Sequence, residues 1–143
     1  MPFRNAEPWI GETIASILSQ TYTDWEIIAV NDHSSDESER VLKSFQDRRI
    51  HIYQNSGKGI IAALQTALKK ATGVYITRMD ADDLMPENRL KLFADAIADS
   101  PAKTVITGRV RYFAMGSVSE GYLKYQDWLN ERCETGVSIA FPF

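Results

Sequence analysis

The sequence predicts an α/β fold in which a mostly parallel sheet is covered by helices on both faces. Apolar residues recur with helical spacing in segments of about a dozen residues, and these alternate with short β-branched runs in the order α-β-α-β-α-β-α-β. The chain has 143 residues, of which 44% are hydrophobic and 24% charged, which suffices for a compact domain with an apolar core. Acidic residues follow two of the apolar runs, at the sheet edge where such folds bind ligands.

The first part of the chain contains two predicted helices on either side of an apolar strand. Residues 7–19 predict a helix because their apolar side chains recur on one face, and Pro8 suits its first turn. The continuous β-branched run at 26–30 predicts a strand that is covered on both faces. Ser34 and Glu37 have the spacing of a capping box, so we expect the next helix to begin at Ser34.

The same two patterns continue along the rest of the chain. A β-branched run predicts a strand over 50–53, and an apolar helical face predicts a helix over 60–71 with Gly73 as its C-cap. The run at 74–79 predicts a third strand, and Pro86 opens a further helix. Shorter apolar patterns predict the last elements, which are strands over 104–107 and 110–113 and a helix over 122–133.

The composition argues against several classes of function. The net charge of −3, from 16 basic and 19 acidic residues, provides no overall basic field for nucleic acid. Cys133 is the only cysteine, so neither an internal disulfide nor a cysteine-based zinc site is expected, and a reducing compartment suits the chain. No apolar run reaches the ~18 residues that a membrane-spanning helix needs.

Three carboxylates lie close together after the predicted strand over 74–79. Asp80, Asp82 and Asp83 fall within a few residues of one another, where their charges repel. A hard divalent cation such as Mg²⁺ or Mn²⁺ relieves this repulsion and prefers oxygen ligands. The alternative is a turn and helix-cap cluster before Pro86, since Asp favours both positions. The place at the end of a buried strand favours the ligand site for Asp80 and Asp82, whereas Asp83 suits either interpretation.

Asp32 is the candidate at the other strand end. It comes directly after the apolar run at 26–30 and therefore at the edge of the sheet where a ligand is expected. A carboxylate there can accept a ring N–H from a nucleobase. We expect it to be an exposed loop residue whose loss affects binding more than folding.

Two further features carry weaker signals. Gly57 and Gly59 are not a phosphate-binding loop, because the longer glycine spacing and the Lys-Ser/Thr ending are missing. Trp9, Trp25 and Trp128 are more often packing residues than platforms for a sugar, and the sequence leaves both interpretations open.

Taken together and in order, six segments resemble the opening of family 2 glycosyltransferases. The resemblance covers residues 1 to about 101 and becomes specific through the order and spacing of its pieces. These are residues 2–6 (PFRNA), 16–22 (SILSQTY), 24–28 (DWEII), 32–36 (DHSSD), 59–65 (GIIAALQ) and 73–83 (GVYITRMDADD).

The resemblance implies a GT-A fold, which is Rossmann-like, and a metal-dependent glycosyltransferase. Such an enzyme transfers a sugar from a nucleotide-diphosphate sugar, with a UDP-sugar expected, to an acceptor hydroxyl, usually with inversion. By the resemblance, Asp32 holds the base, Asp80 lies near the ribose or donor sugar, and Asp82 binds Mn²⁺ or Mg²⁺ on the diphosphate. Pro2 and Arg4 border the nucleotide, and the arginine plane can stack on the base. The catalytic base stays unassigned.

The resemblance also implies a division of the chain. Residues 1–113 are expected to form the nucleotide-sugar-binding domain, and 114–143 the start of a truncated acceptor-binding region for a glycan or lipid-linked acceptor in polysaccharide biosynthesis. We expect a cytoplasmic location, with peripheral association at the inner face of the membrane left open, and self-association through the apolar end at 141–143. The alternatives are a receiver-like Mg²⁺-binding signalling domain and a donor-binding relic without catalysis; the chain alone is expected to transfer sugar poorly or not at all.

Overall fold

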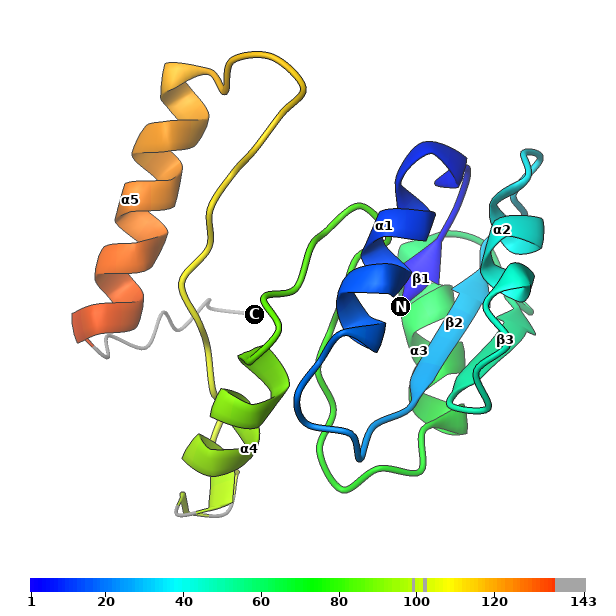
Figure 1. Ribbon diagram of the computed structural model, residues 1–143, viewed down its shortest axis with the longest axis horizontal. Helices are drawn as coiled ribbons and strands as arrows, with labels where there is room; N and C mark the ends of the chain where they lie inside the picture. The colour runs from blue at the N-terminus through cyan, green and yellow to red at the C-terminus, as the bar shows by residue number, and fades with distance from the viewer. Residues whose placement is uncertain (99, 102, 136–143) are drawn as a thin grey trace. The chain divides into compact units, whose positions relative to one another are not determined.

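The computed structural model, shown in Figure 1, describes residues 1–98, 100–101 and 103–135 and has an α/β fold, as the sequence predicts. The chain packs as two compact units, Met1–Asp95 and Ala96–Phe143. The boundary predicted after residue 113 between a donor-binding and an acceptor-binding part stays a prediction. The apolar end at 141–143 lies outside the described residues, so the self-association expected from it also stays a prediction. The elements in chain order are β1 (Pro2–Phe3), α1 (Glu7–Leu18), β2 (Ile27–Asn31), α2 (Ser38–Ser44), β3 (Ile50–Gln54), α3 (Ile60–Lys70), α4 (Arg89–Ala98) and α5 (Glu120–Thr135).

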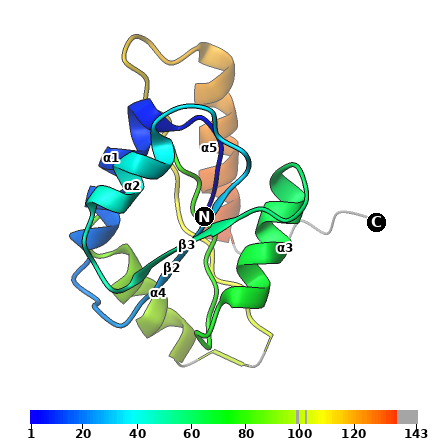
Figure 2. The ribbon, with the colours of Figure 1, turned by 90° about the vertical axis from the view of Figure 1, so that its right-hand side faces the viewer.

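The described part of the first unit contains a three-stranded parallel sheet in the order β1-β2-β3. Every residue of β2 is buried, and its side chains alternate between two apolar cores. Ile27 and Ala29 join the core with α1 and α2, whereas Ile28 and Val30 pack with Ala63 of α3. Figure 2 shows α3 on one side of the strands and α1 with α2 on the other. The prediction of a strand covered on both faces is therefore confirmed.

The helix after β2 begins later than its sequence indicates. The predicted capping box is wrong, because α2 begins at Ser38 and the Ser34 hydroxyl instead accepts a hydrogen bond from the Asn5 amide at 3.1 Å. Asp36, directly before the N-cap residue Glu37, supplies an acceptor instead: its carboxylate accepts from the Ser38 amide at 3.1 Å and from the Glu7 amide at 3.0 Å. One carboxylate thus ties the beginnings of α1 and α2 together.

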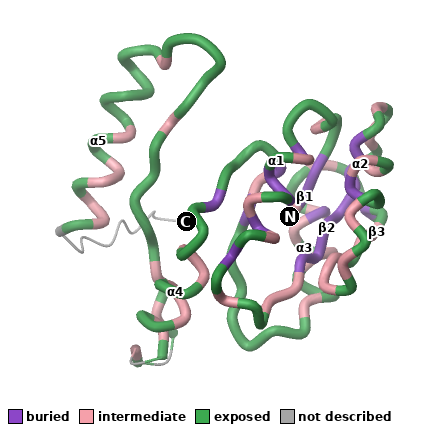
Figure 3. Tube along the Cα trace, in the orientation of Figure 1, coloured by how far each residue is buried: buried purple, intermediate pink, exposed green. Residues whose placement is uncertain are grey.

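The predicted strand over 74–79 is absent from the described residues. Val74 is 89% exposed, and Tyr75 and Ile76 are exposed as well, as Figure 3 shows for this loop. A strand needs a neighbour with free backbone groups, but β1 has two residues, of which Pro2 has no N–H to donate. β-branched composition alone therefore does not produce a strand here.

The end of α3 also differs from the prediction. The C-cap is Ala71 in an extended conformation, not Gly73. The amides of Thr72 and Gly73 donate to the Glu26 carboxylate at 2.7 and 3.2 Å, which draws the chain away from the helix axis.

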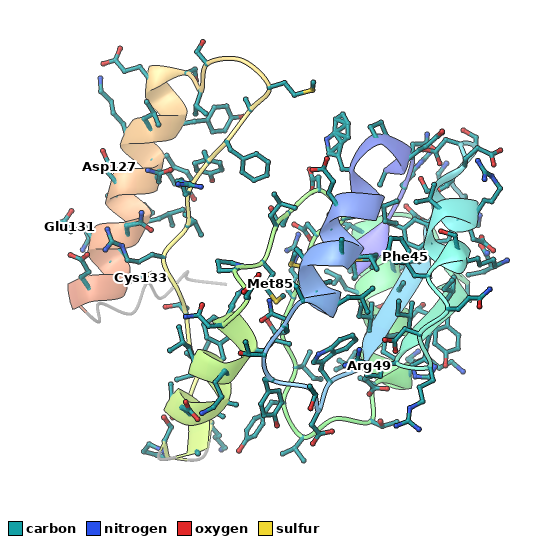
Figure 4. The ribbon with its side chains drawn as sticks, viewed as in Figure 1. Phe45, Arg49, Met85, Asp127, Glu131 and Cys133 are labelled. Atoms are coloured by element: carbon teal, nitrogen blue, oxygen red, sulfur yellow. The ribbon has the colours of Figure 1, made fainter. Side chains whose placement is uncertain are left out.

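In the second unit, the predicted strands over 104–113 are replaced by an extended segment that bonds to side chains of α5. The Asn130 side chain donates to the Val110 carbonyl at 2.9 Å and accepts from its amide at 2.8 Å, and Gln126 accepts from the Tyr112 amide at 2.7 Å. Further along α5, Cys133, labelled in Figure 4, donates to a backbone carbonyl of the same segment. Side-chain amides thus replace a β ladder, and the predicted helix over 122–133 is confirmed within α5. Of the helices in the described ranges, none has the length and apolar character that crossing a bilayer requires.

A carboxylate on α2 connects the ends of two strands. Glu39 accepts hydrogen bonds from the Asn31 and Gln54 side chains at 2.7 and 2.6 Å and pairs with Lys43 at 2.6 Å. The Lys43 bond, followed by the two amide bonds, lowers the pKa of Glu39 to about 2. The ionised form is therefore favoured in the folded chain.

We expect this network to make the fold sensitive to acid. The pKa of Glu39 is about 2 in the folded state and near 4.5 when unfolded, so its stabilisation is complete above pH 4.5 and disappears as the pH falls toward 2. Urea unfolding between pH 5 and pH 3 should show a larger loss of stability for the unaltered chain than for Glu39→Gln. Glu37→Gln, which removes an exposed partner of Arg40, is the matched control and should keep the full pH dependence. If the stability of the unaltered chain and that of Glu39→Gln fall by the same amount between pH 5 and pH 3, the acid sensitivity does not come from Glu39.

Candidate functional site

A cavity of about 570 Å³ lies at the carboxyl ends of β1 and β2. Its walls come from β1 and the following loop, the first turn of α1, the residue after β2, the start of α3 and the acidic segment. All of the site residues predicted from the sequence line this one cavity: Pro2, Arg4, Asp32, Asp80 and Asp82. The topology therefore brings together side chains that are up to about 80 positions apart in the sequence.

Asp32 is buried, and the expectation of an exposed loop carboxylate is wrong. Its carboxylate accepts hydrogen bonds from the Asn55 side chain at 2.7 Å and from the Gly59 amide at 3.0 and 3.1 Å. The Asn55 bond is the main cause that lowers the pKa of Asp32, with the Gly59 amide and the Arg4 charge acting in the same direction. Asp32 therefore stays ionised at neutral pH and also organises the loop that precedes α3.

Asn55, which holds the Asp32 side chain from behind the cavity wall, is a residue that the sequence interpretation missed. It is buried directly after β3, and its side chain donates to Asp32 and, at 3.3 Å, to the Gly59 carbonyl while accepting from the Gly57 amide at 3.1 Å. Gly59 has φ +86°, a left-handed conformation that glycine adopts without strain. The sequence signal that could have pointed to Asn55 is its position, as a polar residue between a predicted strand and two closely spaced glycines.

The acidic segment is held by α1 and not by the sheet. The buried Thr13 hydroxyl donates to the Ala81 carbonyl at 2.9 Å, between the two carboxylates of the cavity. One helical turn on, Ser16 accepts from the Met85 amide at 3.1 Å, and Gln20, just past the end of α1, donates to the Pro86 carbonyl at 2.7 Å. Met85 lies beside α1 in Figure 4. This row of polar side chains fixes the backbone from which the carboxylates project.

The acidic residues have different local partners. Arg78 makes a two-pronged ion pair with Asp80 at 2.9 and 3.0 Å, while the Asp82 carboxylate has no hydrogen bond or ion pair with the described residues. Partial burial, with the negative charges of Asp80 and Asp82, raises the pKa of Asp83. The cluster does not cap a helix, since α4 begins only at Arg89. An excess of negative charge thus borders the cavity.

The donor set is compatible with a hard divalent cation. No group of three or more His, Cys, Asp or Glu side chains with the geometry of a metal site occurs among the described residues. Magnesium and manganese nevertheless bind through one or two carboxylates when water and phosphate oxygens complete the shell. Asp80 and Asp82 supply such a pair in one cavity, and Asp82 is the one whose oxygens are free.

A family model described as "Glycosyl transferase family 2" matches residues 1–136. Among curated proteins, the Escherichia coli UDP-Glc:alpha-D-GlcNAc-diphosphoundecaprenol beta-1,3-glucosyltransferase WfgD is 41% identical over 93 residues, which are 64% of this chain and 37% of the relative. Glycosyltransferase GlyG of Streptococcus pneumoniae is 31% identical over 134 residues, which are 92% of this chain and 44% of the relative. The chain thus spans less than half the length of these relatives.

Solved structures show the same fold. S. aureus TarS, in complex with UDP-GlcNAc, superposes with a TM-score of 0.62 and 26% identity over 68% of this chain and 30% of its own. The mannosyltransferase PcManGT from Pyrobaculum calidifontis, in complex with GDP-Man and Mn²⁺, has a TM-score of 0.60 and 28% identity over 70% of this chain and 31% of its own. These structural neighbours have the GT-A fold.

The α1 anchor can be tested at Thr13. Replacing Thr13 by Val keeps the shape but leaves the buried Ala81 carbonyl without its donor, and we expect a loss of about 1–3 kcal/mol in the free energy of unfolding. Thr66→Val is the matched control, because the Thr66 hydroxyl bonds to a carbonyl within α3 at 2.9 Å that the helix itself also satisfies. Urea unfolding of both variants measures the difference, and equal losses would show that Thr13 anchors nothing.

Proposed function

Because the chain belongs to glycosyl transferase family 2, we propose that it binds a nucleotide-diphosphate sugar, with a UDP-sugar expected, for transfer to an acceptor hydroxyl. We further propose that the transfer is metal-dependent and inverts the anomeric carbon. The observation that carries the proposal is the convergence of Asp32, Asp80 and Asp82 on one cavity at the carboxyl end of the sheet. Family membership argues against the receiver-like signalling domain that the sequence left open.

At the nucleotide end, Asp32 is proposed to accept a ring N–H of the base. An ionised carboxylate has about four acceptor positions, and its bonds to Asn55 and Gly59 hold it in place for a further donor. Arg4 lines the same cavity and can stack its guanidinium plane on the base or pair with phosphate. Pro2 contributes rigid backbone to the same wall.

At the diphosphate end, Asp82 is proposed to hold Mn²⁺ or Mg²⁺, with Asp80 beside the ribose or donor sugar. When bound, such a cation neutralises charge that develops on the departing diphosphate. Arg78 keeps Asp80 oriented by its two-pronged ion pair, and the Thr13 bond keeps the backbone between the carboxylates fixed. These residues therefore position the donor without reorganisation during the reaction.

The chemical step is displacement at the anomeric carbon by the oxygen of the acceptor hydroxyl. The new C–O bond forms as the bond to the diphosphate breaks, and a carboxylate takes the hydroxyl proton. This base stays unassigned.

The acceptor is proposed to be a glycan or a lipid-linked glycan, with the protein at the inner face of the membrane. The names of relatives support this, since one is named for action on a diphosphoundecaprenol-linked sugar and another for teichuronic acid biosynthesis.

The metal assignment predicts a metal-specific loss in Asp82→Asn. Calorimetric titration with UDP in the presence of Mn²⁺ should show an affinity that is at least about tenfold lower than that of the unaltered chain, because the substitution removes a charged ligand. In EDTA the two affinities should be equal. Asp95→Asn on α4, which removes an exposed carboxylate paired with Lys91, should change neither value. If the unaltered chain binds UDP with equal affinity with and without Mn²⁺, the proposal of a metal site is wrong.

The base assignment predicts that Asp32→Ala weakens UDP binding by roughly 10- to 100-fold, as expected for a lost hydrogen bond to a charged group. It should also lower stability, because the loop before α3 loses its anchor. Asn55→Ala disturbs the same loop but keeps the carboxylate, so it separates the two effects. If both variants lose the same UDP affinity, Asp32 acts only through the loop.

A further inference from the structure

Trp9 does not pack in the interior, although tryptophan usually does. It belongs to the first turn of α1, is 45% exposed and lines the same cavity as Asp80 and Asp82. The other two tryptophans have partners: the Arg49 guanidinium lies 3.7 Å from the ring centre of Trp25, and Trp128 stacks on Tyr125. Among the described residues, Trp9 has neither a stacked ring nor a cation over its indole. The cavity wall thus contains a large uncovered aromatic face.

The wall around Trp9 is apolar and offers no binding site for phosphate. At this end of α1 the Glu7 amide already donates to Asp36 at 3.0 Å, Pro8 has no N–H, and the Trp9 amide donates to the Ala6 carbonyl at 3.0 Å. The helix end therefore lacks the free N–H groups that bind anions elsewhere. What remains is an apolar surface of Ala6, Pro8 and Trp9 in a cavity whose other groups include carboxylates.

We propose that Trp9 is the platform for a pyranose ring of the reaction, an inference that rests on the proposed function. A pyranose has an apolar C–H face and a rim of hydroxyl groups. An indole suits the face, since it is flat, rigid and apolar, while carboxylates such as Asp80 and Asp82 suit the rim as hydrogen-bond acceptors. The sugar is joined directly to the diphosphate, which the proposed function places at these carboxylates. The ring on Trp9 belongs to the donor sugar or to an acceptor sugar.

The test uses the fluorescence of Trp9 itself. The double substitution Trp25→Phe and Trp128→Phe leaves Trp9 as the only tryptophan and alters residues outside the cavity. With Mn²⁺ present, UDP-glucose or methyl glucoside added to the UDP-loaded chain should shift or quench the emission beyond the effect of UDP alone. An emission unchanged by both sugars would overturn the proposal.

Calorimetry on single substitutions separates the donor from the acceptor. Trp9→Ala should weaken binding of a sugar-bearing ligand about 3- to 10-fold and leave UDP affinity unchanged, while Trp9→Phe should keep most of the affinity. A selective loss for UDP-glucose assigns the platform to the donor sugar, and a selective loss for methyl glucoside on the UDP-loaded chain assigns it to the acceptor. An equal loss for UDP and UDP-glucose, or no loss, would overturn the proposal. If the unaltered chain does not bind UDP, the proposed function itself fails, and this inference fails with it.

Discussion

The site depends on polar side chains of α1 and of the residue that follows its C-cap. Thr13 and Ser16 lie one helical turn apart on α1, and Gln20 comes just after the helix; all three bond to backbone groups of the segment that carries the acidic residues. In a parallel sheet, the ladder to a neighbouring strand would normally satisfy these groups. Here the helix supplies the partners, so the carboxylates keep a defined place without a fourth strand. The same helix begins at the cavity and presents Trp9 there, so the packing of one helix determines both the acidic and the aromatic wall.

A second set of interactions fixes the opposite side of the cavity. Asp32, Asn55 and Gly59 join the end of β2 to the beginning of α3 through buried and partly buried hydrogen bonds. A carboxylate that serves a loop in this way is already oriented before a ligand arrives, which lowers the entropic cost of binding. The proposed binding residue is therefore also a structural residue, and its hydrogen bonds explain how this carboxylate stays ionised although it is buried.

The sequence predicted the elements whose signals are local. The two-sided burial of β2, the three helices nearest to it and the place of Asp32 at the carboxyl edge of the sheet follow from periodicity and the parallel topology. Asp80 and Asp82 reach the same cavity although the strand that was expected to carry them there is absent from the described residues. The strand over 74–79 could not be judged from its own residues, because pairing depends on the length of β1. The capping box at Ser34 failed for a similar reason: Asp36 bonds to the start of α1, far away in the sequence. Asn55 was missed, and Trp9 could not be distinguished from the other two tryptophans, because their surroundings depend on contacts that only the folded chain creates.

The uncovered run at 74–76 has a consequence for the behaviour of the chain in solution. Val74, Tyr75 and Ile76 combine β-branched and aromatic character with exposed backbone, which is the composition of segments that recruit strands from other molecules. The basic residues before the run, Lys69 and Lys70, oppose such recruitment by electrostatic repulsion between copies. Colloidal stability of the chain should therefore decrease as salt screens these cations. Ionic strength, more than the stability of the sheet, therefore determines how readily copies of the chain associate through residues 74–76.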